Sequence, residues 1–110
     1  MIKARYRLNV SLADRGLKPC FRGSFFAIKR RDNGLSHSRI GVVLSKRYSK
    51  KATARNKLKR EIFNFFASNK DFLEDKSRAY DILIVILTTE ANIKDNKEAF
   101  TKELNNVISI

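Results

Sequence analysis

The chain has 110 residues, which is enough for one domain with its own hydrophobic core. Its 24 Lys and Arg residues outnumber 11 Asp and Glu residues, and the net charge of +13 favours a polyanionic partner over a small-molecule substrate. One cysteine and one histidine exclude an internal disulfide and a multi-cysteine zinc site. The longest apolar run has six residues, against the roughly twenty of a membrane span, and no secretory signal follows the basic N-terminus, so we expect a cytoplasmic protein with no membrane partner.

The positive charge is concentrated in the first part of the chain. Residues 1–60 carry 18 basic and two acidic residues, whereas residues 61–110 carry six basic and nine acidic ones. The densest stretch, 46–60, has eight basic residues and no acid. A membrane-surface helix needs a free apolar face, but the basic helix predicted below should use its apolar face in the core. The charge pattern therefore favours nucleic acid, bound by a single domain that spans residues 1–110.

The first predicted elements are an arm and a strand. Residues 1–22 are polar and basic, and we expect them to pack on the sheet as an extended segment with one short helix near 11–16, before Pro19. Residues 24–30 are rich in aromatic and β-branched residues, which is typical of a strand.

A second strand is predicted over residues 39–45. The Asp32-Asn33-Gly34 turn signal precedes it, so the two strands are expected to pair as an antiparallel hairpin with a long loop. A basic loop, 46–51, follows the second strand.

Residues 52–68 have the strongest helical pattern, with Ser49 or Thr53 as candidate caps. At 100° per residue one face is apolar, formed by Ala54, Leu58, Ile62, Phe65 and Phe66. The opposite arc is polar and is formed by Asn56, Lys57, Lys59 and Arg60. Phe63 also falls on this polar arc. One side of the helix can therefore pack on a sheet while the other presents cations.

Residues 81–88 form a continuous apolar run, which is typical of a strand covered on both faces. Strand, helix and strand in this order form a βαβ unit, so 39–45 and 81–88 are expected to be parallel. Residues 95–109 predict a closing helix. The fold class is α+β, a small mixed sheet with helices packed on it.

The hexapeptide Arg55–Arg60 has the chemistry of a phosphate-binding surface. Arg and Lys neutralise phosphates, and the planar Arg side chain can also hold a phosphate through two hydrogen bonds or stack on a base. Consecutive cations spread around the helix, which suits an irregular RNA surface better than a smooth DNA groove. A reader of duplex DNA and a purely structural basic helix remain open on composition alone.

This part of the sequence resembles the protein component of bacterial ribonuclease P. The matching residues have the family's spacing: Ser49, Ala52, Arg55, Asn56, Lys57, Lys59, Arg60 and Ile62. The upstream strand that ends in Ser45-Lys46-Arg47 and the later strand and helix also fall where the family has them. Phe63 stands where the family usually has a basic residue, and residues 8–18 lack the phenylalanines common in its N-terminal helix.

The resemblance implies a ribonucleoprotein in which a catalytic RNA, with Mg²⁺ held mainly by that RNA, removes the 5′ leader of precursor tRNA. The protein would bind the catalytic RNA and the single-stranded leader and would supply no catalytic or metal-binding residue. The implied fold has about four strands, two to three helices and a left-handed βαβ crossover, as in the second domain of ribosomal protein S5. The general rule for such crossovers is right-handed.

Two sets of site residues follow from the resemblance. The predicted RNA-binding set is Lys46, Arg47, Lys50, Lys51, Arg55, Asn56, Lys57, Lys59 and Arg60. The predicted leader-binding set is Phe25, Phe26, Ile28 and Tyr48. Because neighbouring side chains on a strand point in opposite directions, one of Phe25 and Phe26 should face the core and the other the opposite side of the sheet.

Two other functions are compatible with the composition. A small ribosomal or translation-associated RNA-binding protein with no role in cleavage would have the same charge. A stand-alone nuclease needs several carboxylates near a basic site, but nine of the eleven acids lie after residue 60.

Overall fold

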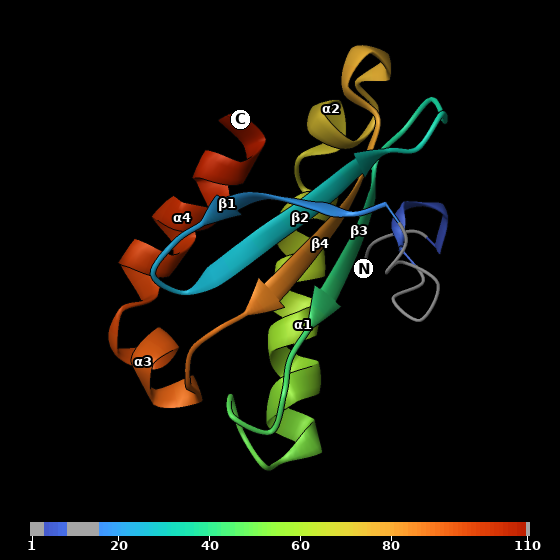
Figure 1. Ribbon diagram of the computed structural model, residues 1–110. Coiled ribbons are helices and arrows are strands. Elements are labelled where there is room, and N and C mark those ends of the chain that lie inside the picture. Colours follow the sequence, from blue (N-terminus) through green and yellow to red (C-terminus); the bar gives the residue numbers. More distant parts are fainter. Residues whose placement is uncertain (1–3, 9–15, 110) are drawn as a thin grey trace.

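The computed structural model describes residues 4–8 and 16–109, and these form an α+β fold (Figure 1). Its main elements in chain order are β1 (Lys18–Arg22), β2 (Phe26–Asp32), β3 (Arg39–Val43), α1 (Ala52–Ala67), α2 (Lys70–Leu73), β4 (Tyr80–Ile86), α3 (Glu90–Asp95) and α4 (Lys97–Ser109). Two short 3₁₀ turns, η1 (Ala4–Tyr6) and η3 (Lys76–Arg78), complete them. The strands and long helices are those that the sequence predicts, and α2 and α3 are short additions between them.

The four strands form one mixed sheet in the order β1-β2-β4-β3. β4 pairs with β2 antiparallel and with β3 parallel, so the predicted parallel pair is confirmed. The predicted hairpin between the second and third strands is wrong, because β4 lies between β2 and β3. The physical reason is the composition of β4: four consecutive residues, 81–84, are buried, and a strand covered on both faces belongs in the middle of a sheet. β2 forms its hairpin with β1 instead.

The βαβ crossover is left-handed, as the resemblance implied. In Figure 1, β3 and β4 both point downward, α1 lies behind the sheet, and β4 lies to the left of β3. A right-handed connection would place β4 on the other side of β3. The crossover puts the loop after β3 and the start of α1 together at one end of the molecule.

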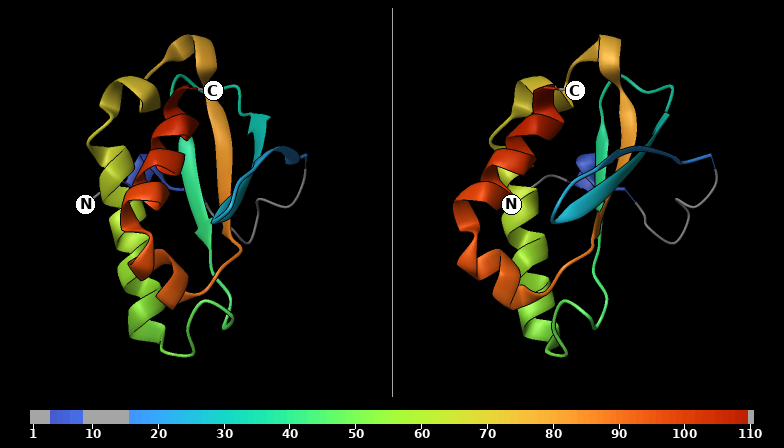
Figure 2. Two further views of the ribbon diagram at one scale, coloured as in Figure 1. Left: turned by 90° about the vertical axis from the view of Figure 1, so that its left-hand side faces the viewer. Right: turned by 60° about the vertical axis from the view of Figure 1, so that its left-hand side comes forward.

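The core lies between the sheet and its two long helices, which cover the same face (Figure 2). α1 contributes Leu58, Ile62 and Phe66, which confirms the apolar stripe predicted from its periodicity. α4 contributes Phe100, Leu104 and Val107. The strands complete the core with Phe26, Ile28, Ile40, Val42, Ile82, Ile84 and Ile86. This packing leaves the polar arc of α1 turned away from the sheet.

The described N-terminal residues lie along the free edge of β3. Arg7 forms a parallel bridge with Ile40, and the Leu8 N–H donates to the Ile40 carbonyl at 2.8 Å. Tyr6 and Leu8 are buried on either side of Arg7. The short helix predicted near 11–16 lies, apart from Gly16, outside the described residues.

Candidate nucleic-acid interface

The basic loop and the first turn of α1 form one folded unit. α1 begins after Lys51, whose side chain makes no capping hydrogen bond, so neither Ser49 nor Thr53 is the cap. Ser49 instead accepts a hydrogen bond at its hydroxyl from the Lys51 N–H at 3.2 Å. Arg55 Nη1 donates to the Ser49 carbonyl at 2.7 Å and ties the loop to the helix. A guanidinium has five N–H donors, so Arg55 can hold the loop and still donate outward.

The cations of this unit face solvent. In the predicted RNA-binding set, Arg55 and Lys59 are half-buried, and the other members, Lys46, Arg47, Lys50, Lys51, Asn56, Lys57 and Arg60, are exposed. Within residues 4–8 and 16–109, the ion pairs involve none of these side chains. The one acid of α1, Glu61, pairs with Lys97 of α4 at 2.8 Å. The structure therefore brings the predicted set together as a surface whose positive charge is not neutralised by acids of the described chain.

Elsewhere in the structure, cations are neutralised. Asp81, at the start of β4, is almost fully buried and accepts two hydrogen bonds from Arg39, at 2.7 and 2.8 Å. Arg31 and Asn33 donate to the same carboxylate at 3.0 and 3.2 Å. Burial alone would raise the pKa of Asp81, but the hydrogen bonds from Arg39, Arg31 and Asn33 outweigh it and hold the pKa below its usual value. This carboxylate ties β2, β3 and β4 together.

Tyr48 is a core residue rather than a stacking platform. Its side chain is 7% exposed, and its carbonyl accepts a hydrogen bond from the Glu90 N–H at 2.9 Å, which links the basic loop to α3. Burial raises the pKa of the Tyr48 hydroxyl, and the negative charges of Glu90 and Glu61 raise it further. The loop is therefore anchored from beneath, and the prediction that this ring meets the leader is wrong for the described structure.

The other predicted leader-binding side chains are also in the core. Phe25, Phe26 and Ile28 are 6%, 0% and 2% exposed. Both phenylalanines meet the ring of Phe100 edge-on, with centroids 5.7 and 6.0 Å away. The predicted alternation of Phe25 and Phe26 fails because β2 begins at Phe26 and Phe25 lies in the preceding bend. These rings are therefore covered by α4 and do not line an open cleft.

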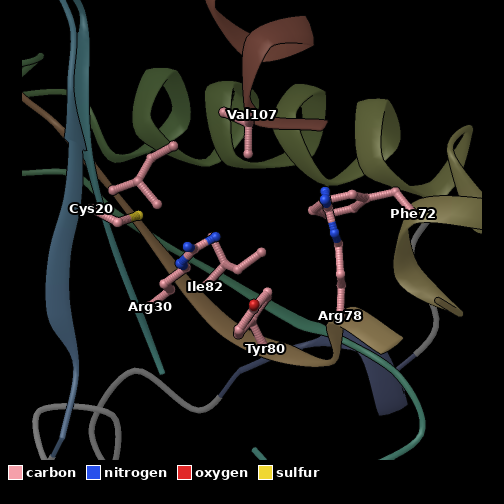
Figure 3. A pocket seen from close by; sticks show the side chains of 8 residues that line it. Cys20, Arg30, Phe72, Arg78, Tyr80, Ile82 and Val107 are labelled. Atoms are coloured by element: carbon pink, nitrogen blue, oxygen red, sulfur yellow. The ribbon is translucent and has the colours of Figure 1, made fainter. Parts of the chain in front are cut away.

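Ile28 does reach a small cavity of about 20 Å³ at the end of the sheet near α2 and α4 (Figure 3). The cavity is lined by Cys20, Ile28, Arg30, Phe72, Arg78, Tyr80, Ile82 and Val107. The guanidinium of Arg30 lies over the Tyr80 ring, 4.6 Å from its centroid. Burial raises the pKa of the Cys20 thiol, and the charge of Arg30 opposes this rise.

A larger open hollow of about 480 Å³ adjoins this cavity and shares Cys20, Arg30 and Tyr80 with it. It is lined further by Gly16, Lys18, Pro19, Arg31 and Asp32. Cations beside a tyrosine ring are a combination that binds single-stranded nucleic acid. Sequence reasoning missed this surface because its residues come from different strands, and only the pairing of β1 with β2 and of β2 with β4 brings them together.

A family model for ribonuclease P matches residues 16–110. The chain belongs to the ribonuclease P protein family. It is 36% identical over 78 residues to the ribonuclease P protein component of Coxiella burnetii, an alignment that covers 71% of this chain and 60% of that protein. It is 38% identical over 61 residues to the Thermotoga maritima protein component, covering 56% and 49%. These alignments span about half to three-fifths of the curated relatives' length.

Solved structures of the family have the same fold. The ribonuclease P protein from Thermotoga maritima superimposes with a TM-score of 0.71 at 26% identity, covering 93% of this chain and 94% of that one. The Staphylococcus aureus protein gives a TM-score of 0.63 at 24% identity, covering 88% and 93%, and is similar in fold. The basic loop and α1 thus occupy the region of the family's sequence signature, and in the described part of the chain no helix is long and apolar enough to cross a membrane.

Proposed function

We propose that this chain is the protein subunit of a ribonuclease P ribonucleoprotein, which removes the 5′ leader from precursor tRNA while the RNA subunit carries out the chemistry. The observation that supports this most strongly is the family signature on a helix face whose cations have no acidic partner in the described structure. Such a surface keeps its attraction for phosphate, because no internal carboxylate competes for the guanidinium and ammonium groups.

The α1 residues would divide the work of holding the catalytic RNA. Arg60 and Lys57 are exposed and can neutralise phosphates directly. Asn56 is an exposed neutral donor and acceptor that suits a sugar hydroxyl. Arg55 holds the loop through the Ser49 carbonyl, so it would set the position of Lys50 and Lys51 as well as donating itself.

We place the leader on the hollow beside Arg30 and Tyr80 rather than on the buried phenylalanines. The small cavity has room for little more than a water molecule. The larger hollow is open, and Lys18 and Arg30 on its rim can attract a single strand, with Tyr80 available for stacking. Its position at the opposite end of the sheet from the loop would let one protein contact the catalytic RNA and the substrate together.

Mg²⁺ would act in the RNA subunit, where it supplies charge stabilisation for phosphodiester hydrolysis. Among the described residues, no group of three or more His, Cys, Asp or Glu side chains could hold a metal ion. The contribution of this chain would be to reduce repulsion between the phosphates of the catalytic RNA and those of the substrate. It should therefore lower the Mg²⁺ concentration at which the ribonucleoprotein works.

A processing assay tests the proposal. A bacterial ribonuclease P RNA and a precursor tRNA are incubated in low Mg²⁺ with and without the protein, and leader removal is followed on a gel. The protein is expected to accelerate leader removal, and the Arg55→Ala, Arg60→Ala double variant is expected to do so less. Protein without the RNA serves as the control and should not cleave. Wild-type protein that binds the RNA but gives no acceleration would instead indicate a structural RNA-binding protein.

A further inference from the structure

Phe63 interrupts the basic arc of α1. It lies seven residues, or two helical turns, after Asn56, and therefore on the same side of the helix. Lys59 and Arg60 lie one turn before it, at the i−4 and i−3 positions. Phe63 is half-buried and packs at the edge of the core. By itself, it ends the cationic surface one turn after Arg60.

Arg7 restores a cation at this point. Its guanidinium carbon lies over the Phe63 ring, 5.4 Å from the centroid, although the two residues are 56 positions apart in the sequence. Its backbone is held by the bridge to Ile40 and by a hydrogen bond from its N–H to the Ala4 carbonyl at 3.0 Å. Because Tyr6 and Leu8 are buried on either side, Arg7 is held exposed at a fixed place beside α1.

The neighbouring Arg5 provides a contrast within the same segment. Arg5 donates to the Glu74 carboxylate at 2.7 Å, and Tyr6 donates to the same carboxylate through its hydroxyl. Burial of Tyr6 and this contact attach the segment to the loop after α2. Arg7 takes part in none of the ion pairs within the described ranges. Stacking uses the face of its guanidinium and leaves the N–H edges able to donate to a phosphate.

We propose that Arg7, stacked on Phe63, is an RNA-binding residue that extends the basic surface of α1 by one helical turn beyond Arg60. The phosphate it contacts belongs to the same RNA that α1 binds, so this inference rests on the proposed function. The cation comes from the N-terminal segment, and it reaches α1 because that segment pairs with the edge of β3.

The test compares Arg7→Gln with Lys102→Gln, which removes the same charge from an exposed position on α4. The dissociation constant for ribonuclease P RNA is measured over a series of salt concentrations, and folding is checked by thermal melting. Arg7→Gln is expected to weaken binding about fivefold and to reduce the salt slope by about 0.7 to 0.9, as for one lost phosphate contact. Lys102→Gln should leave both values close to wild type, and Arg7→Lys should keep the slope.

Phe63→Leu tests the stacking itself. If the ring positions Arg7, the effect of Arg7→Gln on affinity should be smaller in the Phe63→Leu background than in the wild type. Equal affinities and salt slopes for Arg7→Gln and Lys102→Gln, with Arg60→Ala still impaired, would overturn the inference and leave the proposed function standing. Failure of the wild-type protein to bind the RNA would instead overturn the proposed function.

Discussion

The molecule uses its arginines in two opposite ways. At the start of β4, Arg31 and Arg39 surround the buried carboxylate of Asp81 and hold three strands together. On α1 and the loop before it, the cations have no acidic partner within the described chain and point to solvent. The difference is the position of one acid, and it decides whether a guanidinium stabilises the fold or remains available to an external polyanion.

This comparison separates stability from affinity. Substitutions in the Asp81 cluster should change the free energy of unfolding and leave RNA affinity intact in the folded protein. Substitutions on α1 should do the reverse.

The largest expected effect comes from Asp81→Ala. It leaves Arg39 and Arg31 beside each other without their counter-charge and should lower the free energy of unfolding by about 3 kcal/mol. Urea denaturation followed by circular dichroism measures the change. Asp81→Asn, which keeps an oxygen acceptor, serves as the milder control. Unfolding midpoints equal to wild type in both variants would show that this cluster does not support the sheet.

The same carboxylate predicts a pH effect. The pKa of Asp81 is lower in the folded protein than the value near 3.9 of an unfolded chain. Its contribution to stability is therefore present above about pH 4 and is lost as the pH falls through the folded pKa. The difference in unfolding free energy between wild type and Asp81→Asn, measured from pH 6 to pH 2, should shrink toward the acid end. A constant difference would contradict the assignment.

On the other side of the comparison, Arg60→Ala should weaken binding to ribonuclease P RNA by about 1 kcal/mol, or fivefold, without lowering the melting temperature. Arg55→Ala should weaken binding and also loosen the loop, because it loses the hydrogen bond to the Ser49 carbonyl. Filter binding and thermal melting of both variants distinguish the two roles. Identical behaviour of the two variants would mean that the Arg55 contact has no effect on the interface.

The smallest expected effect concerns Glu103, a buried carboxylate with no cation beside it. Its Oε2 accepts from the Phe25 N–H at 3.3 Å, and Oε1 has no hydrogen bond within the described residues. Burial raises its pKa, although the N–H groups of Phe25 and Ser24 oppose this. The ionised form is therefore unfavourable in the fold at neutral pH, and Glu103→Gln should stabilise the protein at pH 7 by up to about 1 kcal/mol. Below about pH 4 the gain should disappear, and a gain independent of pH would point to packing instead.

The parts of the fold that the sequence predicts are those with local signals. The periodicity of α1 specifies which side is buried, and the absence of acids from 46–60 specifies which side carries charge. The run of apolar residues in β4 identifies a central strand, and the order of elements predicts its parallel pairing with β3. These features depend on residues close together in the chain.

The missed features depend on long-range packing. A turn signal at 32–34 suggests a hairpin, but β4 inserts between the two strands because it is apolar on both faces. Tyr48 looks like a stacking residue in a basic loop, and only the position of α3 shows that it is buried. The pairing of Arg7 with Phe63 likewise requires the N-terminal segment to reach the edge of β3.

The most direct test of the basic interface is the salt dependence of binding to ribonuclease P RNA. A variant with Lys57→Gln, Lys59→Gln and Arg60→Gln is compared with one carrying Lys70→Gln, Lys76→Gln and Lys102→Gln, which loses the same charge from the second half of the chain. If α1 holds the RNA, the slope of log affinity against log salt should fall by about 2 in the first variant, with 0.7 to 0.9 for each phosphate lost, and stay near the wild-type value in the second. Equal slopes in the two variants would contradict the account.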